Sequence, residues 1–197
     1  MLGNYFQFAA FAMAMAQFAE AQDSVPQDLQ AGFESSGKEV QVSYTNNAVS
    51  GFSDGTSFEK DEVADEPTFA LGDSSGISST TLYTIIMVDT TCDDARKLHY
   101  ARSNFKYNFD ITNLETDSEP LLEYKAPGAF GETGDDRKYT FLMYTNPGRK
   151  EITELQMPGE GETFDAKKFQ DDNGLRDAGA GLGMTVKLGG ESSCDGS

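Results

Sequence analysis

The chain has 197 residues, with 15 lysines and arginines against 33 aspartates and glutamates, which gives a formal net charge of -18. That charge excludes nucleic-acid binding, since few cations are available to neutralise phosphates, and it argues against electrostatic binding to anionic membranes. A hydrophobic share of 38% and an aromatic share of 11% indicate a folded chain long enough for one domain. One histidine and two cysteines are too few for a four-ligand zinc finger, and we expect neither a metal nor a cofactor.

The N-terminal region predicts secretion. Phe6–Phe18 is an apolar run with the length of a signal-peptide core, short of the roughly 20 residues that cross a bilayer. Small residues stand at positions -3 and -1 of a cleavage site after Ala21, so we expect a signal peptide over 1–21 and a single domain over 22–197. The alternative is an N-terminal amphipathic helix, because no lysine or arginine precedes Lys38. No later apolar run is long enough for a transmembrane segment.

Short apolar or alternating runs, bounded by turn residues, predict strands along the rest of the chain. After a short helix at Val25–Gly32, the predicted strands are Val40–Tyr44, Pro67–Leu71, Thr81–Asp89, Leu98–Phe105, Lys138–Tyr144 and Ala180–Leu188. The third of them is the most hydrophobic, and its β-branched and aromatic residues indicate a buried central strand. Leu121–Asp136 is rich in glycine and predicts a long surface loop, and a second short helix is expected from Ala166. Several short strands with few helices predict a mainly antiparallel β-sandwich.

The two cysteines, Cys92 and Cys194, fit an oxidising compartment, where an even count commonly pairs. A bond between them would close a loop of about 100 residues and stabilise the fold by on the order of 4–5 kcal/mol. The alternative is that both thiols are free, and the sequence leaves the two interpretations open.

Gly51–Gly55 matches the G-x-S-x-G pattern of serine hydrolases, with Ser53 as the nucleophile. That mechanism needs a hydrophobic strand before the pattern, a helix after it, and His99 as the base. Asparagine and serine precede the pattern and Thr56 follows it, so a turn between strands is the favoured interpretation.

His99 is the single histidine, and it follows the predicted central strand that ends in Asp89. If both residues lie at the same end of adjacent strands, they could orient each other in a functional site. The other interpretation is a half-buried histidine with one backbone partner.

The order of these segments resembles one known family. Tyr83–Asp89 reads YTIIMVD, His99 and Asn104 follow as H-x-x-x-x-N, and after a Pro/Gly loop Arg137–Tyr144 reads RKYTFLMY. In the phosphatidylethanolamine-binding protein family, a YTLxMxDPDAP stretch precedes HWxxxN, and GTGxHRYxFLLY follows a Pro-rich loop. The resemblance covers Val40 to Leu188. It implies a β-sandwich with small peripheral helices and an anion pocket at one end that accepts phosphate or phosphorylated headgroups.

The resemblance also implies which residues bind the ligand. The family's pocket aspartate falls on Asp89, its first histidine on His99 and its tyrosine on Tyr139, while Arg137 replaces the second pocket histidine. His99 and Arg137 would supply donors, Tyr139 a hydroxyl or a ring wall, and Asp89 would orient the donors. An arginine binds phosphate bidentately and stays charged at every relevant pH.

Two departures weaken the predicted pocket. Both prolines of the family's DPDAP stretch are absent, so the shape of the pocket wall is no longer fixed. Four carboxylates, Asp93, Asp94, Asp135 and Asp136, lie on the two loops that would flank the site and would repel an anion.

Two functions from different classes follow. The leading hypothesis is a secreted, non-enzymatic protein that binds a small anionic or phosphorylated headgroup, such as that of a phospholipid, in a weakened pocket. The alternative is a protein-interaction module with a vestigial pocket, for example a secreted carboxypeptidase inhibitor, because some members of the family inhibit a serine carboxypeptidase. Hydrolysis through Ser53 is the third and least favoured function.

Overall fold

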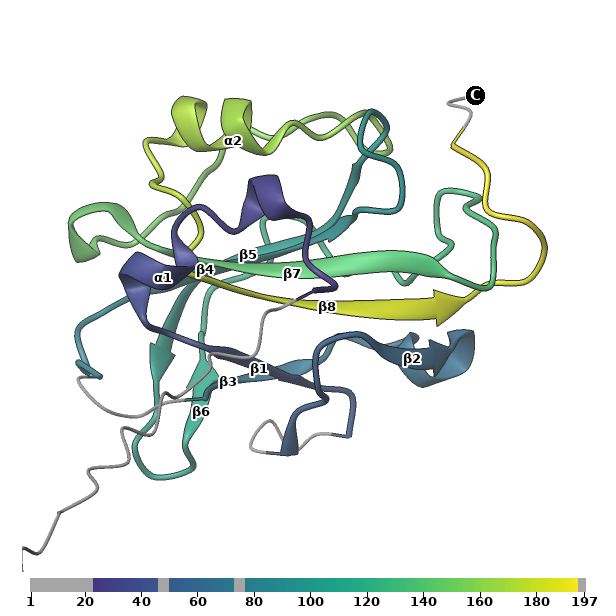
Figure 1. Ribbon diagram of the computed structural model, residues 1–197. Coiled ribbons are helices and arrows are strands. Elements are labelled where there is room, and N and C mark those ends of the chain that lie inside the picture. Colours follow the sequence, from purple (N-terminus) through teal and green to yellow (C-terminus); the bar gives the residue numbers. More distant parts are fainter. Residues whose placement is uncertain (1–22, 46–49, 73–76, 195–197) are drawn as a thin grey trace, which may run out of the picture.

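The computed structural model describes residues 23–45, 50–72 and 77–194, which form eight strands and a few short helices (Figure 1). The predicted signal peptide and its cleavage site lie outside the described residues. Within those ranges, no helix has the length and apolarity to cross a membrane. The strands are β1 (Val40–Ser43), β2 (Thr56–Glu59), β3 (Thr68–Leu71), β4 (Tyr83–Asp89), β5 (Lys97–Tyr107), β6 (Asn113–Glu115), β7 (Arg137–Thr145) and β8 (Ala180–Lys187). The helices are η1 (Gln27–Leu29), α1 (Phe33–Ser36), η3 (Lys60–Val63), η4 (Pro147–Arg149) and α2 (Ala166–Asn173).

The strands form one curled sheet in the order β1-β3-β6-β5-β4-β7-β8-β2. All neighbours are antiparallel except β2 and β8, which are parallel. One half of the sheet contains β1, β3 and β6, and the other contains β4, β7, β8 and β2. The long strand β5 belongs to both halves, because its first part pairs with β4 while Lys106 and Tyr107 pair with β6. The two halves therefore face each other, which confirms the predicted mainly antiparallel β-sandwich.

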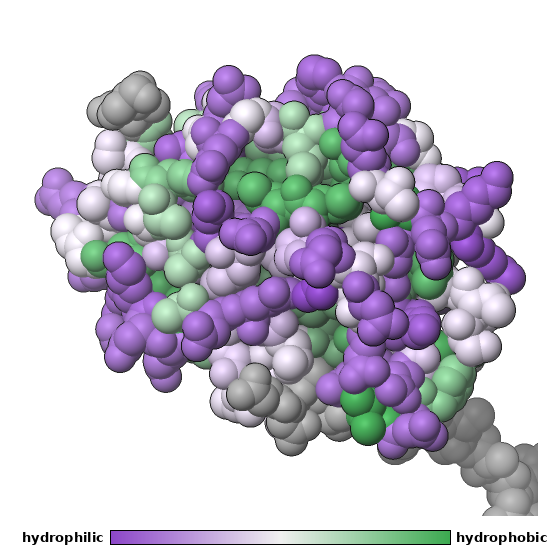
Figure 2. All heavy atoms as spheres, turned by 180° about the vertical axis from the view of Figure 1, so that it is seen from behind, coloured by the Kyte–Doolittle hydropathy of each residue, from purple (hydrophilic) through white to green (hydrophobic). Residues whose placement is uncertain are grey.

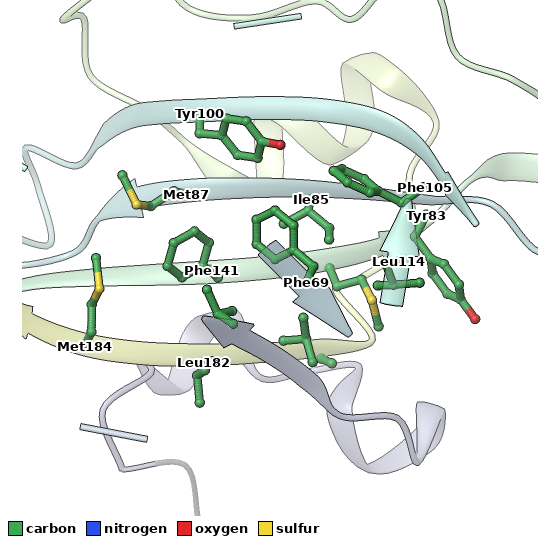
Figure 3. Packing of buried hydrophobic residues seen from close by; sticks show 14 of the residues in the cluster. Phe69, Tyr83, Ile85, Met87, Tyr100, Phe105, Leu114, Phe141, Leu182 and Met184 are labelled. Carbon is green, nitrogen blue, oxygen red and sulfur yellow. The ribbon is translucent and has the colours of Figure 1, made fainter. Parts of the chain in front are cut away.

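The main core lies between the two halves of the sheet (Figure 3). Phe69 on β3 projects into it, and its ring centroid lies 6.1 Å from that of Tyr100, 5.4 Å from Phe105 and 5.8 Å from Phe141. Tyr100 and Phe105 belong to β5 and Phe141 belongs to β7, so the Phe69 side chain on β3 connects the two halves of the sheet. Offset and edge-on ring contacts of this kind add to the stabilisation that burial of apolar area provides.

A second core covers the outer face of β4 and β7. The N-terminal segment contributes Val25 and Leu29, and α2 contributes Phe169, whose ring lies against those of Tyr144 and Phe164. Figure 1 shows α2 and the N-terminal segment on this side of the sheet. Because β4 has apolar neighbours on both faces, all seven of its residues are buried, as predicted for a central strand.

All six predicted strands are confirmed, with ends that differ by at most two residues. α2 begins at Ala166 as predicted and ends at Asn173, where Gly174 with φ 61° caps it. The predicted N-terminal helix is shorter, since only Gln27–Leu29 within it is helical. β2 and β6 were not predicted because TSFE and NLE each contain a single apolar residue, which gives no alternation to read.

Asn104 of the H-x-x-x-x-N pattern has a structural role. It adopts φ 65°, a conformation that asparagine tolerates better than most residues. Its amide nitrogen donates to the Ser118 hydroxyl and to the Ile152 carbonyl, and its oxygen accepts from Asn146 and from the Ile152 N–H. Asn104 therefore anchors the segments on either side of β7 rather than joining His99.

Of the two interpretations that the sequence left open, the structure shows the disulfide between Cys92 and Cys194, which lie 102 positions apart. Cys92 lies three residues after the end of β4, and Cys194 lies seven residues after the end of β8. The bond therefore holds residues 188–194, which we call the C-terminal strap, against the end of the sheet where β4 ends.

Reduction of this disulfide should destabilise the protein. The loop-closure entropy of about 100 residues corresponds to roughly 4 kcal/mol, or a fall in Tm of roughly 10 °C. Thermal unfolding with and without a thiol reductant measures this fall in Tm. In Cys92→Ser/Cys194→Ser the reductant should change nothing, since the chain has no other cysteine. An unmodified protein whose Tm ignores the reductant would contradict the prediction.

Candidate functional site

The four predicted site residues converge at one end of the sheet. Asp89 is the last residue of β4 and lies directly opposite Tyr139 on β7, so their side chains share a face. Arg137 is the first residue of β7, and His99 is close to the start of β5. In antiparallel neighbours, the end of one strand meets the beginnings of the next ones. All four side chains are buried, with exposed fractions of 0% for His99 and Tyr139, 1% for Asp89 and 5% for Arg137.

Asp89 and Arg137 form an internal ion pair. Nε and Nη2 of the guanidinium lie 2.8 and 2.7 Å from Oδ2 of Asp89. The other carboxylate oxygen, Oδ1, accepts from the Thr91 N–H at 2.9 Å. The third guanidinium nitrogen, Nη1, donates to the Ser193 carbonyl at 3.0 Å. Both charges are thus hydrogen-bonded within the protein, as burial requires.

His99 pairs with a residue that the sequence analysis did not single out. Its Nε2 lies 2.9 Å from Oε1 of Glu132, and its Nδ1 lies 2.9 Å from the Lys125 carbonyl. A carbonyl and an ionised carboxylate only accept, so both ring nitrogens must carry protons if Glu132 is ionised. The pair is then a buried imidazolium and carboxylate, a second internal ion pair.

The environment of Glu132 agrees with an ionised carboxylate. Burial raises the pKa of Glu132, but the hydrogen bond and charge of His99 and the N–H of Phe130 outweigh burial and lower that pKa to about 2. Oε2 accepts from the Phe130 N–H at 2.9 Å. Glu132 therefore carries its charge at neutral pH and holds His99 in place.

Aromatic rings close the space around His99. The His99 ring makes edge contacts with Phe130, at 4.7 Å between centroids, and with Tyr139, at 5.1 Å. The Tyr139 hydroxyl accepts from the Gly128 N–H at 3.1 Å. Burial, with the nearby charges of Asp89 and Glu132, raises the pKa of Tyr139 far above neutral, so the phenol stays protonated. These rings keep water from the His99–Glu132 pair.

The C-terminal strap covers the same end of the sheet. The Ser193 carbonyl accepts from Arg137, as described above. In addition, the Ser192 hydroxyl donates to Asp136 and the Gly189 N–H donates to Asp135. The disulfide to Cys92 fixes its last residue. The strap thus supplies a carbonyl oxygen to Arg137, where the sequence analysis expected an oxygen of an anionic ligand.

Two expectations need correction, one about the loop before β7 and one about the partner of His99. The segment from Leu121 to Asp136 is not only a surface loop, because it carries Pro127 and Glu132 into the interior. Asp89 was expected to orient both donors; it does bind Arg137, but Glu132 and not Asp89 lies against His99. The four flanking carboxylates, Asp93, Asp94, Asp135 and Asp136, are exposed as flanking residues should be. No local pattern in this acidic chain marks Glu132 as the carboxylate that turns inward.

Asp89, His99 and Glu132 are the described residues that could hold a metal ion, since their ligand atoms lie within 4.8 Å of one another. Those atoms already bind each other or Arg137. A cation would have to break both ion pairs and lie beside a guanidinium, which repels it. The arrangement suits two internal ion pairs better than a metal.

Ser53 lies in the predicted turn. Its carbonyl accepts from the N–H and the hydroxyl of Thr56, where β2 begins. The neighbouring Asp54 carboxylate accepts from Ser24 and Gly183, and it connects the turn to the N-terminal segment and to β8. Both nitrogens of His99 are bonded to Lys125 and Glu132, so His99 is not placed as a base for Ser53.

The Glu132–His99 pair predicts a pH dependence of stability. Because the pKa of Glu132 is lower in the folded protein, its contribution is complete above the unfolded value of 4.5 and is lost as pH falls from there towards 2. The loss is of the order of 3 kcal/mol. Urea unfolding between pH 6 and pH 2.5 should show a smaller fall for Glu132→Gln than for the unmodified protein. Glu154→Gln, at an exposed carboxylate, is the matched control, and equal falls in all three would contradict the prediction.

No family model and no curated protein sequence matches this chain. Among solved structures, carboxypeptidase Y inhibitor, determined in complex with its cognate proteinase, is similar with a TM-score of 0.61 and 16% identity, over 77% of this chain and 83% of that chain. The solution structure of CG7054 is similar over 77% and 85% of the two chains at 18% identity, with a TM-score of 0.47. Carboxypeptidase Y inhibitor has the phosphatidylethanolamine-binding protein fold, and at this identity the likeness shows that fold alone.

Proposed function

We propose that this protein is a secreted, non-enzymatic interaction module that inhibits a protein partner, with a serine carboxypeptidase as the candidate target. The observation that carries the proposal is Glu132, whose carboxylate lies against His99, where the motif resemblance implies an anionic ligand. The site at Asp89 and His99 then stabilises the fold, and function lies on the outer surface.

The charges of the site support this assignment. His99 and Arg137 are each paired with a carboxylate of the chain, so the buried group is neutral in sum. An anionic headgroup would have to displace Glu132 or the Ser193 carbonyl and leave the displaced group buried without its partner. Breaking a buried pair in this way costs about 3–5 kcal/mol, more than one new phosphate contact returns.

The comparison of folds supports the same functional class, a protein inhibitor. The similar solved structure is an inhibitor bound to a proteinase. The disulfide between Cys92 and Cys194 fits the oxidising compartment in which a secreted inhibitor would act. The internal bonding of His99 leaves Ser53 without a base, which favours a non-enzymatic protein.

The test is inhibition of carboxypeptidase Y. Hydrolysis of a chromogenic peptide by the enzyme should fall as the protein is added, with saturation at one protein per enzyme. His99→Gln should inhibit as well as the unmodified protein, provided that circular dichroism shows the variant to be folded. If His99→Gln does not fold, Glu132→Gln, which keeps the shape of the site, takes its place in the test. Full enzyme activity at tens of micromolar protein would refute the proposal for this enzyme class.

The second candidate function is binding of a phosphorylated headgroup, which the convergence of Asp89, His99, Arg137 and Tyr139 favours. Its test is calorimetric titration with phosphoethanolamine at millimolar concentration. We expect no heat from the unmodified protein and weak binding by Glu132→Ala, which frees His99 and leaves space beside it. Binding by the unmodified protein that His99→Ala or Arg137→Ala abolishes would instead establish headgroup binding as the function.

A further inference from the structure

Among the residues that the structure describes, two large hydrophobic side chains are exposed, Phe109 at 58% and Ile111 at 48%. Single exposed apolar residues are common, but these two lie on the same short loop between β5 and β6. We call residues 108–112 the hairpin tip. Figure 1 shows that this loop projects from the lower end of the sheet. Figure 2 shows many hydrophilic residues on this face, with the largest hydrophobic area in its upper half and a smaller one near the lower end of the molecule.

The hairpin tip is held in one conformation by its own hydrogen bonds. The Asn108 carbonyl accepts from the Thr112 N–H at 2.8 Å, and the Asn108 side-chain oxygen accepts from the Asp110 N–H at 2.9 Å. Thr112 adopts φ 62°, which closes the loop so that the Asn108 N–H reaches the Asn113 carbonyl. These bonds fix the backbone that presents the two apolar side chains.

The base of the tip is anchored to the sheet. The ring of Phe109 rests edge-on against that of the buried Tyr107, at 4.8 Å between centroids. The Asn108 amide donates to the Glu115 carboxylate on β6 at 2.8 Å. A rigid loop loses little conformational entropy on binding, so its apolar side chains contribute most of their burial energy to affinity.

The surroundings of the tip are acidic and hollowed. Residues 106–119 contain four carboxylates and one lysine. A hollow of about 470 Å³ adjoins β6, and its lining includes Glu115 and Asp117 beside Arg102 and Glu66. Arg102 and Glu66 are bonded to each other, which leaves the carboxylates of Glu115 and Asp117 to set the charge of the rim nearest the tip.

We infer that the hairpin tip is the surface through which this protein engages its partner, by inserting Phe109 and Ile111 into an apolar pocket of a protein whose rim is basic. The inference rests on the proposed function and names the surface that performs it. Charge complementarity selects this occupant, because the acidic rim and the net charge of -18 repel both an anionic membrane and a second copy of the chain. The buried site at the other end of β5 takes no part in the contact.

The test compares inhibition constants for carboxypeptidase Y. Phe109→Ser/Ile111→Ser should raise the inhibition constant by roughly 30-fold or more, because rigid apolar anchors carry much of the energy of an interface. Phe109→Leu/Ile111→Leu, which keeps the apolar volume, should stay within roughly 5-fold. Thr153→Ser/Gln156→Ser is the matched control at two exposed, uncharged positions elsewhere, and should inhibit like the unmodified protein. The Tm of each variant verifies that it is folded.

The outcomes separate this inference from the function on which it rests. Inhibition by the unmodified protein that the serine variant loses and the leucine variant keeps supports the tip. Equal inhibition by all variants overturns the tip and leaves the proposed function standing. No inhibition by any of them overturns the proposed function, and the tip with it. A dimer in light scattering that the serine variant dissociates would overturn the inference in favour of self-association.

Discussion

The candidate site depends on one constraint, which is that the most apolar strand of the sheet ends in a carboxylate without access to water. An unpaired charge at Asp89 would cost several kcal/mol, and Arg137, two residues before its neighbour Tyr139 on β7, supplies the opposite charge. The guanidinium is itself buried and needs a third acceptor, which the Ser193 carbonyl provides. The C-terminal strap must therefore cross this end of the sheet, and the disulfide from Cys92 holds it there.

The same reasoning explains the loop before β7. His99 is buried in β5 with a backbone carbonyl on one ring nitrogen, so the other nitrogen needs a partner that is also buried. Glu132 meets that need, and to do so the loop folds inward and brings Phe130 over the imidazole ring. The result is a site that contains the residue types of an anion pocket and satisfies them with groups of the chain itself. The flanking carboxylates near the site lie on the outer loops, where water and salt screen their charges.

Strands with strong apolar runs could be predicted from the sequence because burial on both faces imposes β-branched and aromatic residues over their whole length, as in β4. The strand pattern indicated that Asp89 and His99 could share one end of the sheet, since antiparallel pairing brings such ends together, whereas Arg137 and Tyr139 were added only by the family resemblance. Glu132 could not be predicted, because glycine-rich loop composition says that the backbone turns and not which side chain it turns inward. The Cys92–Cys194 bond was left open for a related reason: whether two distant thiols meet depends on how the sheet curls, which no local pattern encodes.

The closed site and the hairpin tip lie near opposite ends of one strand. From His99 to Tyr107 the chain advances by roughly 25 Å along β5. Over that length β5 pairs with β4 as far as Phe105 and with β6 at Lys106 and Tyr107, and it is buried at nearly every position. We therefore expect that a partner bound at the proposed tip would not sense the charges around His99, as long as those charges keep the sheet folded. An internally paired site and a separate binding surface are compatible within one fold, since the two place their demands on different ends of the sheet.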